Sequence, residues 1–242
     1  MTAWPFPRLI AHRGAGTLAP ENTLAALAVA VRYGYRAVEI DVMLSSEGTP
    51  FLIHDERLDR TTTGTGSVAW ARDAELRALD AGRWHSGRFA GEPLPTLGDA
   101  IRRCLELGLW ANLEIKPATG HEAQTGEAVA RRVLQAWQGP PPLLSSFSAI
   151  ALEAARRIAP ELPRALLLGA FTTDWRAEAE QLGCVAIHSK ARKTTRAHIA
   201  AVRQAGFALA CYTVNDPGEA ERLFAAGVDA IFTDRPDRIR AD

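Results

Sequence analysis

The stretch Ala37-Val38-Glu39-Ile40-Asp41-Val42 (AVEIDV) is an apolar run interrupted by two carboxylates. Its length and its β-branched residues predict a strand, in which Glu39 and Asp41 share one face because side chains alternate. A strand of a parallel sheet is buried on both faces, so two anions there repel each other and lose hydration unless a cation joins them. A divalent metal ion fulfils this requirement. The alternative is that both carboxylates face arginines in solvent at the end of the strand.

Short apolar runs of the same kind alternate with segments of helical periodicity along the whole chain, as is typical of a parallel sheet. Eight strands are predicted: Leu9–His12, Ala37–Val42, Trp110–Ile115, Leu143–Ser146, Arg164–Leu168, Cys184–His188, Leu209–Thr213 and Ala230–Thr233. Seven helices are predicted between them: Asn22–Tyr33, Leu97–Leu107, Glu122–Trp137, Ala149–Ile158, Asp174–Leu182, Arg196–Gln204 and Pro217–Ala226. Eight βα units favour the α/β class and a TIM (β/α)8 barrel over a doubly wound sheet.

One further apolar run, Phe51–His54, follows the second strand after only the short turn Ser45–Pro50 (SSEGTP). Parallel neighbours need a crossover of a dozen or more residues, so Phe51–His54 is predicted to pair antiparallel with an extension of that strand. The segment that follows lacks clear periodicity. We therefore expect a small insertion after strand 2, about residues 43–96, within a single domain spanning 1–242.

Composition excludes several classes of function. The 242 residues carry 28 Lys+Arg and 28 Asp+Glu, so no global field attracts DNA, RNA or an anionic membrane. The three cysteines have no C-x-x-C spacing and read as buried free thiols, and the N-terminus lacks a signal-peptide pattern, so we expect a cytoplasmic protein. The longest uncharged run, Val133–Leu152, is interrupted by Gly139 and three prolines, so no stable membrane insertion is expected. The oligomeric state is left open.

A third carboxylate is predicted beside the first two. In Asn112-Leu113-Glu114-Ile115-Lys116, positions 112, 114 and 116 share one face of the third strand. Strands lie ~4.8 Å apart, so Glu114 can complete an oxygen site with Glu39 and Asp41, and such hard ligands favour Mg²⁺ or Ca²⁺ over zinc. The alternative is a private ion pair between Glu114 and Lys116.

Two histidines are candidates for proton transfer. His12 and Arg13 end the first strand, at the edge where a TIM barrel has its active site. His54 follows the predicted hairpin strand, which would bring a second imidazole over the barrel mouth. Imidazoles on opposite sides of a phosphorus centre can act as base and acid, and the Arg13 guanidinium can bind a phosphate.

The remaining histidines lack such neighbours in the sequence. His85 and His121 are predicted in loops and His198 on a helix surface, whereas His188 is left unassigned.

Together these residues resemble the glycerophosphodiester phosphodiesterase family, in particular its cytoplasmic bacterial members. The family's ordered pattern stands here as His12-Arg13, Glu39-x-Asp41 and His54. The resemblance spans Leu9 to Pro236, through the stretches HRG (His12–Gly14), APENT (Ala19–Thr23), EIDV (Glu39–Val42), EIK (Glu114–Lys116), TVND (Thr213–Asp216) and TDRP (Thr233–Pro236).

The resemblance implies a TIM barrel that uses one divalent cation, with Mg²⁺ favoured and Ca²⁺ as the alternative. It implies hydrolysis of small glycerophosphodiesters, such as glycerophosphocholine, to sn-glycerol 3-phosphate and an alcohol, in glycerophospholipid catabolism. Carried over by position, the metal ligands are Glu39, Asp41 and Glu114, the acid/base pair is His12 and His54, and the phosphate is held by Arg13 and Lys116. Tyr212 is a departure, because many members have Trp there, so contacts with the alcohol are expected to differ.

Charge balance agrees with these roles: three carboxylates, one divalent cation, Arg13, Lys116 and a phosphodiester sum to zero. Two routes of attack stay open, by the glycerol 2-hydroxyl through a cyclic phosphate or by water. Two rival functions are a lipid-acting phosphodiesterase, for which Trp70, Trp84 and Phe89 would form an apolar rim, and a barrel that only binds a phosphorylated metabolite.

Overall fold

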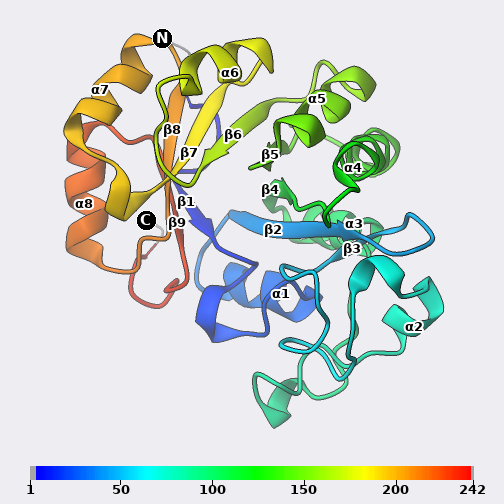
Figure 1. The fold of residues 1–242 in the computed structure, drawn as a ribbon. Coiled ribbons are helices and arrows are strands. Elements are labelled where there is room, and N and C mark those ends of the chain that lie inside the picture. The colour runs from blue at the N-terminus through cyan, green and yellow to red at the C-terminus, as the bar shows by residue number, and fades with distance from the viewer. Residues whose placement is uncertain (1–3, 241–242) are drawn as a thin grey trace.

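The computed structural model describes residues 4–240, which form a closed parallel barrel surrounded by helices (Figure 1). The barrel order is β1-β9-β8-β7-β6-β5-β4-β2, and pairing of Ala11 with Val38 closes the ring between β1 and β2. The strands are β1 (Leu9–Ala11), β2 (Ala37–Leu44), β4 (Trp110–Ile115), β5 (Leu143–Ser146), β6 (Arg164–Leu168), β7 (Ala186–Lys190), β8 (Ala208–Tyr212) and β9 (Ala230–Thr233). The predicted TIM barrel is confirmed.

The helices that cover the barrel also follow the prediction. They are α1 (Leu24–Arg32), α3 (Leu97–Leu107), α4 (Glu122–Ala136), α5 (Ala149–Ile158), α6 (Trp175–Gln181), α7 (Arg196–Gln204) and α8 (Pro217–Ala226). Side-chain caps begin several of them: Thr23, Thr96 and Ser148 each accept a hydrogen bond from a backbone N–H in the first turn.

One strand is displaced from its predicted position. β7 begins at Ala186, two residues after the predicted start at Cys184. Gly183 adopts a left-handed conformation at the end of α6, and the Cys184 N–H donates to the Ala179 carbonyl, so Cys184 completes the helix end. Residues 184 and 185 therefore lead into the strand.

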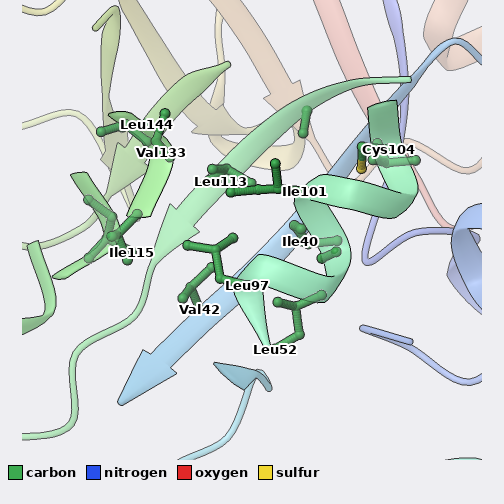
Figure 2. Packing of buried hydrophobic residues seen from close by; sticks show 14 of the residues in the cluster. Ile40, Val42, Leu52, Leu97, Ile101, Cys104, Leu113, Ile115, Val133 and Leu144 are labelled. Atoms are coloured by element: carbon green, nitrogen blue, oxygen red, sulfur yellow. The ribbon is translucent and has the colours of Figure 1, made fainter. Parts of the chain in front are cut away.

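The second strand divides its side chains between two environments. Ile40 and Val42 point outward and pack with Leu97 and Ile101 of α3 (Figure 2). Glu39 and Asp41, on the opposite face, line a cavity inside the barrel. This alternation is the physical reason why a fully buried strand contains two acidic residues, and it confirms that they share a face.

The insertion after β2 begins as predicted. β3 (Pro50–Leu52) pairs antiparallel with β2, with Leu52 opposite Val42. Beyond it lie α2 (Asp73–Arg77) and short 3-10 turns, and α2 was not predicted because five residues give no helical period. The insertion has a small apolar core of its own that includes Phe51, Val68 and Leu76.

Aromatic side chains close the N-terminal end of the barrel. Phe6 stacks on Trp110 with ring centroids 4.3 Å apart, and Trp4 packs edge-on against both. Above them lie His188 and Phe232, whose rings are 4.9 Å apart and which form the floor of the internal cavity. No helix among residues 4–240 combines the length and the apolar character needed to span a bilayer.

Contact between α4 and α5 depends on a residue without a side chain. A Cβ atom added to Gly126 would lie 2.2 Å from the Ala151 carbonyl oxygen, so α4 and α5 can approach this closely only with glycine at that position. Gly98, near the start of α3, has ample space, since its Cβ would lie no closer than 3.7 Å to the Thr96 hydroxyl.

We predict that Gly126→Ala lowers the free energy of unfolding by roughly 1–3 kcal/mol, because the two helices must separate to admit the methyl group. Gly98→Ala is the matched control and should be neutral or stabilising by up to about 1 kcal/mol. Urea unfolding followed by circular dichroism measures both. Equal stability of the two variants would contradict the close-approach interpretation.

Candidate active site

A cavity of about 620 Å³ opens at the carboxyl ends of the barrel strands. Such a volume is typical of small-molecule sites, and this end is where TIM barrels have their active sites. The structure brings all eight predicted site residues to its wall: His12, Arg13, Glu39, Asp41, His54, Glu114, Lys116 and Tyr212.

Three carboxylates form the acidic side of this cavity. Asp41 pairs in register with Glu114, and one oxygen from each of Glu39, Asp41 and Glu114 lies within 4.8 Å of the others. Burial and the neighbouring carboxylates raise the pKa of Glu39 and of Glu114. Within residues 4–240, the buried atoms Glu39 Oε1 and Glu114 Oε1 accept no hydrogen bond. Orphaned anionic oxygens of this kind fit a divalent oxygen-ligated cation.

Asn22 holds one of these carboxylates in place. Its Nδ2 donates to Asp41 Oδ2 at 2.8 Å, and its Oδ1 accepts from the Asp41 N–H at 3.0 Å. Asn22 has a left-handed backbone (φ 58°), a conformation that asparagine tolerates better than most residues. It belongs to the APENT stretch, but sequence reasoning gave it no role, because its bond spans a turn and a strand.

Two cations stand beside the carboxylates. Lys116 Nζ is 3.6 Å from Glu114 Oε1 and 3.9 Å from Asp41 Oδ1, so Lys116 is shared and does not form a private pair with Glu114. Arg13 donates its backbone N–H to Glu39 Oε2 and its Nη1 to Glu21 Oε1. Burial lowers the pKa of Arg13, but Asp41 and Glu21 outweigh this and raise it overall, so its guanidinium stays charged.

His12 is oriented by a carboxylate from the last strand. Its Nδ1 lies 2.6 Å from Asp234 Oδ1, while its Nε2 is on the side of Glu39, 3.8 Å from Oε2. Asn215 in turn accepts from the Asp234 N–H at 2.8 Å and donates to its carboxylate at 3.2 Å. Burial opposes ionisation of Asp234, but the hydrogen bond with His12 lowers its pKa overall. An ionised Asp234 favours the tautomer of His12 with a proton on Nδ1.

His54 has an equivalent partner in its own neighbour. Its Nδ1 lies 2.5 Å from Asp55 Oδ1, and the other Asp55 oxygen accepts from Arg60 Nε. Arg60 also donates two hydrogen bonds to Glu21, at 2.7 and 2.8 Å. Since Arg13 bonds the same Glu21, a continuous chain of charged groups connects His54 in the insertion with Arg13 at the end of β1.

Several residues of the site were missed by sequence reasoning. Asp234 and Asn215 belong to the quoted TDRP and TVND stretches but had no assigned role, and Arg60 was not singled out. The positions of Asn215 and Asp234 just after β8 and β9 were the available signal, whereas Arg60 lies in the insertion well beyond the end of β3. His188, left unassigned, lies on the cavity floor, fully buried, and neither ring nitrogen has a hydrogen-bond partner among residues 4–240. His198 is on the exposed surface of α7, as predicted.

Part of the cavity wall is aromatic. Tyr212 packs edge-on against Phe147 at 6.1 Å, and its hydroxyl donates to the Leu168 carbonyl at 3.0 Å. The phenol is therefore anchored, and its ring presents an apolar surface to the cavity. Tyr212 therefore lines the cavity, and its contact with a substrate stays a prediction.

Comparison with known proteins assigns the family. The model of the glycerophosphoryl diester phosphodiesterase family matches residues 12–238. The chain belongs to this family. It is therefore an enzyme of the phosphoric diester hydrolase class, and the reading as a barrel that only binds a metabolite is set aside. The predicted resemblance is confirmed.

Individual relatives of this glycerophosphodiester phosphodiesterase support the same conclusion. A phosphodiesterase of Oleispira antarctica, solved in complex with the product sn-glycerol-3-phosphate, is 39% identical with a TM-score of 0.93, covering 96% of this chain and 95% of that one. A glycerophosphodiester phosphodiesterase structure from Agrobacterium tumefaciens is 30% identical with a TM-score of 0.80, covering 97% and 99%. The glycerophosphodiester phosphodiesterase of Caldanaerobacter subterraneus is 31% identical over 231 residues, covering 96% and 95%.

The buried imidazole of His188 predicts a pH-dependent stability. Burial lowers its pKa to about 3, against roughly 6.5 in the unfolded chain. Between these values the unfolded state binds more protons, so the free energy of unfolding falls as the pH drops below about 6.5. The loss is about 1.4 kcal/mol per pH unit for this group alone.

We predict that the free energy of unfolding of wild type falls relative to that of His188→Leu by roughly 2 kcal/mol between pH 7.5 and pH 5, because only wild type retains the buried base. Urea unfolding at the two pH values, with His198→Leu as the surface control, measures this. Parallel pH dependence of wild type and His188→Leu would show that His188 is not held neutral by burial.

Proposed function

We propose that this enzyme hydrolyses small glycerophosphodiesters, such as glycerophosphocholine or glycerophosphoethanolamine, to sn-glycerol 3-phosphate and an alcohol. One observation supports this most: a cluster of three buried carboxylates shares one cavity with two cations and with two imidazoles, each bonded to a carboxylate. The product complex of the Oleispira antarctica relative supports the same substrate class. The reaction would serve glycerophospholipid catabolism.

Glu39, Asp41 and Glu114 would hold one divalent cation, with Mg²⁺ favoured and Ca²⁺ as the alternative. When bound, such an ion acts as a Lewis acid toward a phosphoryl oxygen and lowers the pKa of a hydroxyl. Arg13 and Lys116 would bind the remaining phosphoryl oxygens. The charges of these groups and of one phosphodiester then sum to zero.

His12 and His54 would carry the protons. Each imidazole engages a carboxylate through Nδ1, which leaves Nε2 for exchange with the substrate. We assign His12 as the base and His54 as the acid that protonates the leaving alcohol. Attack by the glycerol 2-hydroxyl or by water satisfies this arrangement equally.

The cellular compartment is part of the proposal. Cys104, Cys184 and Cys211 are buried and free, as thiols of a reducing compartment are. We propose a cytoplasmic enzyme that acts on small diesters and not on nucleic acid.

We predict that Glu39→Gln reduces release of sn-glycerol 3-phosphate from glycerophosphocholine to background, because removing one anion weakens the cation site. Excess EDTA should do the same to wild type, with recovery on adding Mg²⁺. The matched control is Glu47→Gln, an exposed residue of the hairpin turn, which should keep full activity. Activity of wild type that survives exhaustive chelation would refute the metal requirement.

We predict that His12→Ala and His54→Ala each lower kcat about 10²–10⁴-fold, the usual range for general acid–base groups. The double variant should lose less than the product of the two effects, because the residues act on one transition state. The surface variant His198→Ala is the control. Turnover near the wild-type value in either single variant would remove that histidine from the mechanism.

A further inference from the structure

The end of β7 is a cationic part of the cavity wall for which the proposed hydrolysis supplies no anion. Lys190 ends the strand, Arg192 and Lys193 follow in a 3-10 turn, and all three exposed side chains line the cavity. Within residues 4–240 none of the three forms an ion pair, whereas Arg13, Arg60 and Lys116 are each paired with carboxylates.

The sequence around this turn is basic far beyond the average of the chain. Gln181 to Asn215 contains five Lys and Arg residues and no Asp or Glu, although the whole chain has 28 of each sign. No nearby segment of this βα unit therefore neutralises the three cations. Their field is directed at the cavity they line, and charges at the mouth of a cleft attract ligands of the opposite sign.

The position of β7 in the barrel separates these cations from the acidic side. In the closed strand order, β7 lies four places from β2 in either direction, so it faces Glu39 and Asp41 across the mouth. A phosphodiester bound beside the carboxylates, Arg13 and Lys116 leaves one of its two arms to extend across the cavity. The wall that this arm meets carries three positive charges.

Charge complementarity then discriminates among alcohols. Glu39, Asp41, Glu114, one divalent cation, Arg13, Lys116 and a phosphodiester sum to zero. Among the described residues that line the cavity, Asp234 is the remaining carboxylate, so the three β7 cations outnumber it. A choline or ethanolamine end is positively charged and would be repelled there. A phosphate or other anion on the alcohol would be attracted and would form charge-assisted hydrogen bonds.

We propose that Lys190, Arg192 and Lys193 form a subsite for an anionic group on the alcohol, so that the preferred substrates are glycerophosphodiesters whose alcohol carries a second phosphate ester. This inference rests on the proposed function, since it concerns the other end of the same substrate. Tyr212 and Phe147 flank the path between the two ends as an uncharged wall.

The test compares two substrates that differ by one anionic arm: glycerophosphoglycerol and 1,3-bis(glycerophospho)glycerol. For wild type, kcat/KM for 1,3-bis(glycerophospho)glycerol should exceed that for glycerophosphoglycerol by about 10-fold, which is the size of effect that a few partly exposed ion pairs produce. This factor is counted in addition to the twofold advantage that its two cleavable bonds give. Glycerophosphocholine should be poorer than glycerophosphoglycerol. Raising the salt concentration should reduce both differences.

Lys190→Gln/Arg192→Gln/Lys193→Gln should abolish the preference, with less than a threefold change for glycerophosphoglycerol. The control is Arg32→Gln/Arg102→Gln/Arg222→Gln, which removes three exposed cations that do not line the cavity. Its net charge therefore equals that of the β7 variant. It should keep the preference. An equal loss in both variants would show a general charge effect and overturn the subsite.

Binding measured by calorimetry in the His12→Ala/His54→Ala background, in which the substrates are not consumed, separates this inference from the proposed function. With the β7 cations intact, this background should bind 1,3-bis(glycerophospho)glycerol about 10-fold tighter than glycerophosphoglycerol, and with the three β7 substitutions added it should bind both alike. Absence of wild-type turnover together with this difference in Kd would overturn the proposed reaction and support the subsite. Equal Kd values with the β7 cations intact would overturn the subsite, whatever the turnover.

Discussion

Mutual repulsion among Glu39, Asp41 and Glu114 is the constraint around which the rest of the site is arranged. Three anions within 4.8 Å in a buried setting are stable only when compensated. Lys116 and Arg13 supply part of the compensation and Asn22 fixes Asp41, yet within residues 4–240 one oxygen of Glu39 and one of Glu114 accept no hydrogen bond. The carboxylate cluster could therefore accept one more cation.

The barrel gives these charges a rigid frame because of the alternation along β2 and β4. The same strands that direct the carboxylates inward direct Ile40, Val42 and Leu113 outward into the helix layer. Apolar packing outside thus determines positions of charge inside. The two imidazoles differ in this respect: His12 is fixed by Asp234 at the end of a barrel strand, whereas His54 lies in the insertion and is connected to β1 through Asp55, Arg60 and Glu21.

Local pattern was enough to predict the strands, most helices and the antiparallel pairing of Phe51–His54, since these depend on side-chain period and on crossover length. The strand register alone was enough to predict that Glu39, Asp41 and Glu114 lie close together. Asp234 could not be assigned in this way, because its bond to His12 joins residues 222 positions apart. Arg60 was missed for the same reason: its role depends on how an aperiodic insertion folds back over the mouth.

The aromatic floor has a consequence for traffic through the enzyme. Trp4, Phe6 and Trp110 fill the barrel beneath His188 and Phe232, so among residues 4–240 aromatic side chains close the end of the barrel opposite the cavity mouth. The axis of the barrel is thus closed to a product, which leaves by the same mouth through which the substrate enters.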